Sequence, residues 1–202
     1  MPPYTYLNRS AAVALYHALI AEDPFYITLE NAASGPQPRE AMFRYMDYSM
    51  TEAENHGKLL LTPDKASGAA IWSLPMPREK AATLSQAKKA FLRDHLGKAS
   101  LETYTRIIDF MGKESEGVLP DPIWYLSILG VDPARQGQGL GGELVRPVLA
   151  EADARGVATY IESFTPSNFG FYERLGFRIM KTVDEPETRS RYAIMIREAR
   201  TP

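Results

Sequence analysis

The sequence contains no cysteine among its 202 residues. Disulfide bonds, thiolate metal ligands and a cysteine nucleophile are therefore excluded, and a reducing compartment such as the cytoplasm is expected. Long hydrophobic runs are also missing, since no apolar stretch approaches the roughly 18 residues that a membrane span needs. The segment from Met1 to Ser10 lacks the apolar core of a signal peptide. We therefore expect a cytoplasmic protein that does not enter a membrane.

An excess of charge of one sign is absent as well. The chain has 23 Lys and Arg residues against 25 Asp and Glu residues, which gives a formal net charge of −2. Because nucleic-acid-binding domains usually carry a basic surface, no nucleic-acid partner is expected. The hydrophobic content of 45% and charged content of 24% are those of an ordinary globular protein. At roughly 100 to 200 residues per domain, residues 1–202 are expected to form a single domain.

Helical and strand-like patterns alternate along the chain. Apolar residues at helical spacing predict helices at residues 10–22, 39–56, 168–175 and from about Leu140 to the stop at Gly156. Residues 78–111 are poor in strand signals and predict a two-helix excursion, interrupted at Gly97, with room to shape a pocket. Short apolar or alternating runs predict strands at residues 58–61, 69–74, 123–131, 158–164, 177–183 and 191–196. The fold class expected from this order is α+β, with a β-α-β unit at its centre.

The most informative segment is a glycine-rich turn between the strand at 123–131 and the helix that follows. Gly137, Gly139 and Gly141 lack a Cβ atom, so backbone N–H groups there can closely approach a ligand. These N–H groups sit at a helix N-terminus, where unpaired donors and the helix dipole favour an anion. Arg135 and Gln136 add a positive charge and an amide to the same turn. The turn therefore predicts phosphate or pyrophosphate binding.

A dinucleotide-binding interpretation of the same turn is weaker. Gly137, Gly139 and Gly142 spell GxGxxG, and Glu162 follows Gly142 by 20 residues, as in a Rossmann fingerprint. That fingerprint usually opens its fold, however, whereas here only 40 residues follow Glu162. A doubly wound sheet does not fit into that length, so a nicotinamide cofactor is disfavoured.

Two ordered motifs in this half of the chain resemble the GCN5-related N-acetyltransferase family. The turn from Gln136 to Gly141 reads QGQGLG and matches the family's QxxGxG signature for the acetyl-CoA pyrophosphate. The segment from Asn168 to Phe177 reads NFGFYERLGF and is similar to the family's NxxxYxxxGF element. Together with Trp124-Tyr125-Leu126 and Ile71-Trp72, these segments look like the puromycin N-acetyltransferase branch.

The resemblance implies a central, splayed, mixed β-sheet that holds acetyl-CoA in a V between the family's fourth and fifth strands. In this chain those strands would be residues 123–131 and 158–164, and Gly130 is expected to mark a bulge or a close backbone approach. Acetyl-CoA is then the co-substrate, and a homodimer is one assembly that the family forms. The cofactor-binding residues implied are Leu129, Val131, Arg135, Gln136, Gly137, Gln138, Gly139, Leu140, Gly141 and Asn168.

Acetyl transfer needs an unprotonated amine and a proton for the departing thiolate. Without a cysteine or a GxSxG motif, direct attack in a ternary complex is favoured over a covalent acyl-enzyme. Tyr172 resembles the family's general acid, because a phenol with a pKa near 10 is protonated at neutral pH. Glu162 is the candidate for removing the amine's proton, and a purely orienting role for this glutamate is equally open.

The acceptor is expected to be a primary amine of a small molecule, bordered by Phe25, Tyr26 and Trp72, although plain core packing explains these three aromatics equally well. Two alternatives stay open: acetylation of a protein or peptide, and a non-catalytic regulator that binds acyl-CoA. His17, His56 and His95 are scattered without metal-ligand spacing, so no metal is expected.

Overall fold

A computed structural model describes residues 5–200. Residues 1–4 and 201–202 of the expected domain lie outside this range, and so does the start of the Met1 to Ser10 segment. Within this range, six strands form one sheet in the order β1-β2-β3-β4-β6-β5. Their bounds are β1 Lys58–Leu61, β2 Gly68–Ser73, β3 Ile123–Val131, β4 Ala158–Ser163, β5 Arg178–Glu185 and β6 Ser190–Arg197. The predicted strands are thus confirmed to within two residues at each end.

The sheet is mixed, as the α+β expectation requires. Strand β3 runs parallel to β4, and the other neighbouring pairs are antiparallel. A doubly wound dinucleotide-binding sheet is parallel throughout its core. The strand order and directions therefore exclude the Rossmann interpretation of the glycine turn.

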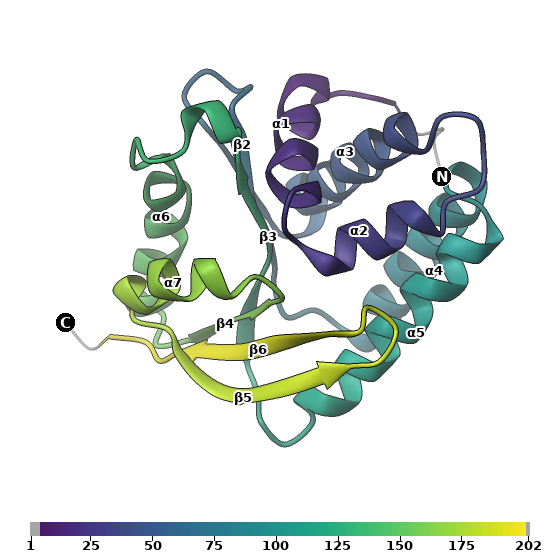
Figure 1. Cartoon of the computed structure of the whole chain (residues 1–202). Helices are drawn as coiled ribbons and strands as arrows, with labels where there is room; N and C mark the ends of the chain where they lie inside the picture. Colours follow the sequence, from purple (N-terminus) through teal and green to yellow (C-terminus); the bar gives the residue numbers. More distant parts are fainter. Residues whose placement is uncertain (1–4, 201–202) are drawn as a thin grey trace.

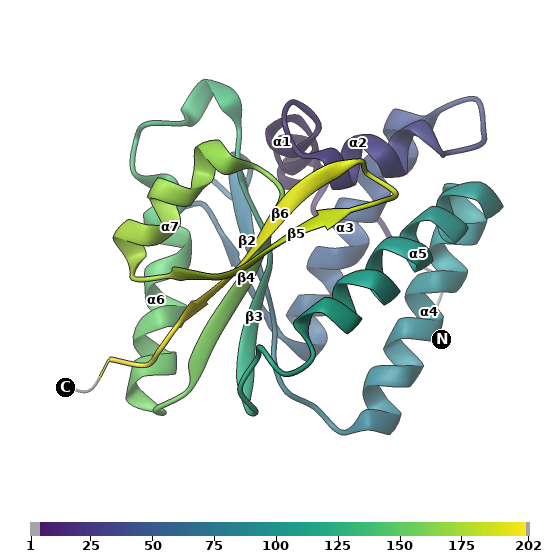
Figure 2. The ribbon, with the colours of Figure 1, turned by 60° about the horizontal axis from the view of Figure 1, so that its bottom comes forward.

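Helices cover both faces of the sheet. Their bounds are α1 Arg9–Ile20, α2 Pro24–Asn31, α3 Pro38–His56, α4 Arg78–His95, α5 Lys98–Ser115, α6 Leu140–Ala154 and α7 Phe169–Leu175, with single 3₁₀ turns at Pro133–Arg135 and Pro166–Asn168. Helices α6 and α7 lie on one face, and α3, α4 and α5 on the other, with α1 and α2 toward one end of the sheet (Figures 1 and 2). The predicted two-helix excursion is confirmed as α4 and α5. Within residues 5–200, no helix combines the length and apolarity required to cross a membrane.

Helix α2 is the one helix that the sequence pattern missed. Asp23 and Pro24 predict the end of α1, but they also begin the next helix at once. The Asp23 side chain accepts a hydrogen bond from the Phe25 backbone N–H at 2.9 Å, and Pro24 occupies the first helical position. An acidic N-cap followed by proline is a favourable helix start. The first turn of α2 therefore presents Phe25 and Tyr26 to the interior.

Two hydrophobic cores flank the sheet. One lies between the sheet and the N-terminal helices α1 to α5, and the other between the sheet and α6 and α7. A β-bulge in β3 changes which residues face each core: Ile71 pairs with Ile128 and Trp72 with Leu126, so Ser127 has no partner in the ladder. The Ser127 hydroxyl instead donates to the Ile71 carbonyl at 3.1 Å. This strand therefore does contain a bulge, but at Ser127, whereas Gly130, where the sequence suggested one, pairs regularly with Ala69.

The second expected feature is present at Gly130 itself. A Cβ atom at Gly130 would lie 2.8 Å from Leu15 Cδ2 and 3.1 Å from the Ala18 Cβ atom of α1. A side chain at this position would require Leu15 and α1 to shift, so glycine favours this close packing of the helix on the strand end.

The parallel pair β3–β4 stays together for only part of its length. Ile123, Trp124 and Tyr125 pair with residues 158–160, and no pairing follows Tyr125–Tyr160. Beyond this point the strands diverge, which produces the splayed sheet that the family resemblance implies. The opening between them is where the cavity described next begins.

Candidate active site

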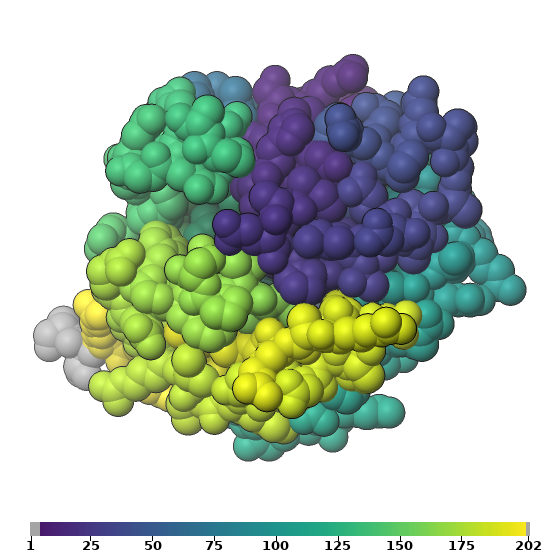
Figure 3. Space-filling view, viewed as in Figure 1, coloured from purple at the N-terminus to yellow at the C-terminus, as the bar shows by residue number. Residues whose placement is uncertain are grey.

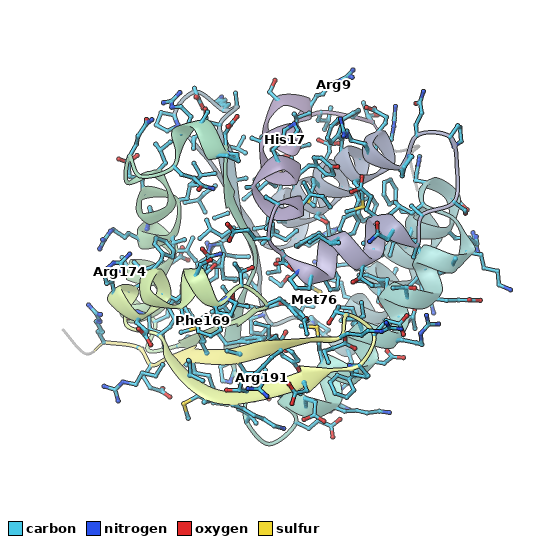
Figure 4. The ribbon with its side chains drawn as sticks, in the orientation of Figure 1. Arg9, His17, Met76, Phe169, Arg174 and Arg191 are labelled. Carbon is cyan, nitrogen blue, oxygen red and sulfur yellow. The ribbon has the colours of Figure 1, made fainter. Side chains whose placement is uncertain are left out.

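A large cavity of about 1030 Å³ lies at the splayed end of the sheet. The diverging ends of β3 and β4, the start of α6, helix α7 and the helices α1 to α5 all contribute to its wall. On the surface, the N-terminal helices face the segments of α6 and α7 across a furrow (Figure 3). Met76 and Arg174, both labelled in Figure 4, are among the residues that border it. Its size suits a ligand considerably larger than a metabolite of a few atoms.

The glycine turn forms one end of this cavity. Gly137 and Gly139 have positive φ angles of 78° and 86°, and a Cβ atom at either position would meet nothing within 4 Å. Helix α6 begins directly after Gly139, so the N–H groups of its first turn have no acceptor within the helix. The turn therefore presents exposed backbone donors to the cavity at the positive end of the α6 dipole.

Hydrogen bonds to neighbouring segments hold the turn in place. The Asp132 backbone N–H donates to the Ser67 carbonyl at 2.8 Å, and Gln136 Nε2 donates to the Val131 carbonyl at 3.1 Å. Arg135 Nε donates to Gln138 Oε1 at 3.1 Å, and Arg135 Nη1 lies 3.5 Å from Asp64 Oδ2. The half-exposed Arg135 charge thus stays near the turn. The loop after β1, which sequence reasoning did not connect to the turn, provides its support.

Tyr172 lies in α7 with its side chain 5% exposed. Burial, together with the nearby Asp23 carboxyl, raises the pKa of its phenol above the ordinary value. The phenol therefore stays protonated across the physiological range and can act as a proton donor.

Glu162 lies in β4, two residues beyond the last position paired with β3. Burial raises the pKa of its carboxyl to about 7, and a hydrogen-bonding interaction with Tyr125 acts in the opposite direction. Among the described residues, nothing hydrogen-bonds its buried Oε1 atom. A carboxyl group with this pKa in a cavity is half ionised near neutral pH, as a general base requires.

Asp23 is a site residue that the sequence analysis missed. Its carboxyl borders the cavity from the turn between α1 and α2, and burial raises its pKa to about 6. No salt bridge to Asp23 is present among residues 5–200. The sequence pattern indicated only that Asp23 ends α1. Asp23 is also the N-cap residue of α2, and this position places its carboxyl in the cavity wall.

The helical wall of the cavity was also hidden from sequence reasoning. Residues at helical spacing on α3, α4 and α5 line it, including Tyr45, Leu84 and Tyr104. Lys88 Nζ of α4 lies 2.5 Å from Glu52 Oε2 of α3, with both side chains about one-fifth exposed (20% and 21%). The charges of this pair compensate each other. Asp23 and Glu162 are therefore the two acidic groups of the wall with burial-raised pKa values that a cationic ligand can neutralise, whereas Glu22, also in the wall, is exposed to solvent.

The structure brings most of the predicted site residues to this one cavity. Its lining includes Phe25, Tyr26, Trp72, Leu129, Val131, Arg135, Gln136, Gly137, Gly139, Leu140, Gly141, Glu162, Asn168 and Tyr172. Gln138 is not part of the lining, and its side chain accepts a hydrogen bond from Arg135 instead. Trp72 borders the cavity, but its side chain is 0% exposed and belongs to the core beneath α6. Phe25 and Tyr26 are likewise largely buried, at 8% and 6% exposure.

Metal chemistry has no obvious ligand set in this part of the chain. Within residues 5–200, no group of three or more His, Asp or Glu side chains is placed to hold a metal ion. His56 borders the cavity from the last turn of α3, and its buried Nδ1 atom has no partner among the described residues.

Residues 99–179 match the sequence profile of the acetyltransferase (GNAT) domain. This range contains β3, the glycine turn, α6, β4 and α7, the elements that build the sheet opening and one side of the cavity. This part of the chain is therefore similar to the GNAT acetyltransferase domain. Among individual proteins, a 60-residue stretch is 40% identical to a mycothiol acetyltransferase from Streptosporangium roseum. That stretch is 28% of this chain, and the match spans only 18% of the relative's length.

Solved acetyltransferase structures share the whole GNAT fold seen here. A Corynebacterium glutamicum protein described as histone acetyltransferase HPA2 and related acetyltransferase superposes with a TM-score of 0.62 at 20% identity, covering 100% of this chain and 96% of its own. The polyamine N-acetyltransferase of Drosophila melanogaster has a TM-score of 0.61 at 14% identity, covering 94% and 95% of the two chains. At these identities the comparison concerns the fold. It extends the likeness beyond residues 99–179 to the N-terminal helices.

Proposed function

We propose that the protein is an acetyl-CoA-dependent N-acetyltransferase that acetylates a primary amine of a small molecule by direct attack in a ternary complex. The observation that carries this proposal is the cavity itself. One end has the open N-terminus of α6, and its wall also contains a carboxyl with a pKa of about 7 and a protonated phenol. The family profile over residues 99–179 supports the same chemistry.

The residues around the turn fit acetyl-CoA. The backbone N–H groups from Gly137 to Gly141 would hold the pyrophosphate, where the open space at Gly137 and Gly139 leaves room for its oxygens. Arg135 would add positive charge, and backbone groups near Leu129 and Val131 lie at the strand end that the pantetheine arm would follow. When bound, acetyl-CoA supplies the acetyl group as an activated thioester.

Glu162 would accept the proton that the acceptor ammonium loses. An alkyl ammonium has a pKa near 10, so proton transfer to an ordinary carboxylate is unfavourable by about 6 pKa units. Burial reduces that gap by raising the pKa of Glu162 to about 7. The neutral amine then attacks the thioester carbon, and the carbon–sulfur bond breaks.

Tyr172 would give its hydroxyl proton to the departing sulfur and regain a proton from the newly acylated nitrogen. The protein's groups then return to their starting states after Glu162 releases its proton to solvent. The products are the N-acetyl amine and the free thiol of CoA.

The acceptor is proposed to be a small cationic amine. Asp23 and Glu162 are acids without a cationic partner in the cavity wall, which favours a ligand that brings positive charge. The solved relatives include an enzyme that forms N-acetylagmatine, and the sequence resembles the puromycin branch. Agmatine, arylalkylamines and amino-nucleosides therefore belong in one acceptor screen.

The test has a binding stage and a turnover stage. Isothermal calorimetry should show micromolar binding of acetyl-CoA and no binding of NADH or ATP. An amine screen followed by release of free CoA thiol should then give acceptor-dependent turnover. Binding without turnover of any amine or peptide would favour the acyl-CoA-binding regulator, and turnover of peptides alone would favour the protein N-acetyltransferase. A cytoplasmic location, one domain over residues 1–202 and a homodimer are part of the same proposal, and size-exclusion chromatography with light scattering tests the last.

A further inference from the structure

Tyr125 and Tyr160 stand at the point where β3 and β4 separate. They are partners in the last registered pair of the parallel strands. Their rings stack with centroids 4.4 Å apart and an interplanar angle of 13°. The stack therefore closes the vertex of the opening, and Tyr125 also belongs to the cavity wall.

Strand geometry directs Tyr125 and Glu162 to the same side of the sheet. Side chains two residues apart on a strand share a face, so Glu162 lies on the face of Tyr160. Tyr125 stacks on Tyr160 and is therefore on that face too. In β3, Ser127 is bulged out of the ladder, and the next paired residue, Ile128, belongs to the same core as Phe164 of the segment after β4. Tyr125 is the one titratable side chain of β3, and it lies on the face of Glu162.

The surroundings of Glu162 contain no compensating charge among the described residues. The titratable groups that interact with it are three phenols, Tyr125 on β3, Tyr160 on β4 and Tyr192 on β6. Only Tyr125 has a hydrogen-bonding interaction with the carboxyl; the other two act through charge alone. Phenols are uncharged near neutral pH, so Tyr160 and Tyr192 exert no charge on Glu162 there. The hydrogen bond from Tyr125 is therefore the interaction that stabilises the ionised carboxylate relative to the protonated carboxyl.

We propose that Tyr125 is a positioning residue for Glu162: its hydroxyl donates a hydrogen bond to the ionised carboxylate and holds it toward the amine site in the cavity. The proposal rests on the proposed function and adds a residue to it. Tyr125 keeps its proton throughout, while Glu162 gains the proton that the acceptor ammonium loses. The stacked Tyr160 ring fixes the Tyr125 ring, so the hydroxyl needs little reorganisation when the carboxyl ionises.

Infrared titration of the free protein tests this arrangement without any substrate. The carbonyl band of protonated Glu162, assigned by its loss in Glu162→Gln, should disappear with a midpoint near pH 7 in the unaltered protein. A hydrogen bond to a charged group contributes about 1.5 to 3 kcal/mol, so Tyr125→Phe should raise the midpoint by about one pH unit or more. Tyr160→Phe is the matched control, since it keeps the stack and removes no hydrogen bond to Glu162, and its midpoint should not move.

Turnover provides the second readout. If the midpoint rises by one unit, the ionised fraction of Glu162 at about pH 7 falls about fivefold, and the acid limb of kcat/KM should move to higher pH by the same amount. Lost positioning should leave kcat of Tyr125→Phe below that of Tyr160→Phe even at high pH, with acetyl-CoA affinity unchanged. Equal midpoints in Tyr125→Phe and the unaltered protein, or equal shifts in the two phenylalanine variants, would overturn the proposal.

A measurement that leaves residue 125 intact covers the case in which Tyr125→Phe does not fold. Fluorotyrosine labelling gives one ¹⁹F resonance per tyrosine. The resonances of Tyr160 and Tyr192, which also interact with Glu162, are assigned by their absence in Tyr160→Phe and Tyr192→Phe. The chemical shift of the Tyr125 resonance should change most at the pH midpoint of Glu162, and this pH-dependent change should disappear in Glu162→Gln. If no further resonance follows that midpoint, Tyr125 does not contact the carboxylate. Failure of acetyl-CoA to bind would refute the proposed function and leave this titration result standing.

Discussion

The pKa of Glu162 predicts that the candidate base destabilises the protein at alkaline pH. Burial raises the pKa from its usual 4.5 to about 7, so the folded state retains a proton that the unfolded state releases. Stability must therefore fall as pH rises from about 4.5 to about 7, and remain lower above that range. At 1.36 kcal/mol per pKa unit, the full cost of the ionised carboxyl is about 3 kcal/mol.

Glu162→Gln removes the ionisation and should remove this pH dependence. An unpartnered amide has its own burial cost of about 1 to 3 kcal/mol, but that cost does not change with pH. The stability of the variant relative to the unaltered protein should therefore rise by about 2 to 3 kcal/mol between about pH 5 and about pH 9. For a chain of this size, such a difference corresponds to about 5 to 10 °C in Tm.

Urea denaturation at a series of pH values measures the effect. Asp23, whose pKa is also raised by burial, titrates in both proteins and cancels in the difference. Glu54→Gln, at an exposed position of α3, is the control and should run parallel to the unaltered protein. If Glu162→Gln also runs parallel, the carboxyl is solvated like an ordinary surface glutamate. The argument that burial prepares it as a base would then be refuted.

Three further predictions concern the phenol, the turn and the attachment of β6. Tyr172→Phe should lower kcat by about 10- to 1000-fold with acetyl-CoA affinity unchanged, because only the proton donor is lost; unchanged turnover would remove the phenol from the mechanism. Gly139→Ala should weaken acetyl-CoA binding in calorimetry at least about tenfold by placing a methyl group among the backbone donors. The matched control is Gly156→Ala at the other end of α6, where φ is also positive, at 65°, and a Cβ atom would likewise meet open space. This control should bind acetyl-CoA with normal affinity. Equal acetyl-CoA affinity in the two variants would refute the phosphate site. Arg197→Met should lower the free energy of unfolding by about 3 kcal/mol, because the 4% exposed guanidinium makes two 2.7 Å bonds to Asp153 and one 3.1 Å bond to the Leu175 carbonyl. The Asp153 carboxylate would keep the hydrogen bond from the Arg200 backbone N–H. A loss below about 1 kcal/mol in urea denaturation would show that the pair contributes little.

The elements near the glycine turn could be predicted because their signals are local. An apolar run bounded by turn residues gives β3 its limits, and a buried parallel strand needs no other pattern. Glycine at positions 137 and 139 signals positive φ, and both residues adopt it. Gly156 and Gly176 end α6 and α7 in the same way, with φ angles of 65° and 101°. Each of these features depends on a few adjacent residues.

The acceptor side could not be predicted because it depends on contacts between distant segments. Asp23 reads as a helix stop, yet the same residue begins α2 and brings an acid to the cavity. Lys88 and Glu52 come from helices separated by the whole β1–β2 hairpin, and only the packing of α3 against α4 makes them a pair. A helix pattern indicates which residues share a face, but not which other helix that face meets.

Ser127 shows how one residue can both obscure a pattern and create a site. Strict alternation along β3 would place Leu126 and Ile128 on one face, but the bulge separates them into the two different cores. The same irregularity comes two residues after β3 stops pairing with β4, and a bulge increases local twist and bends its strand. The sequence contained a signal for it, since Ser127 is the one polar residue in the apolar run from 123 to 131. The bulge thus lies two residues beyond Tyr125, so the residue that breaks the strand pattern is also found where β3 leaves β4 and the cavity begins.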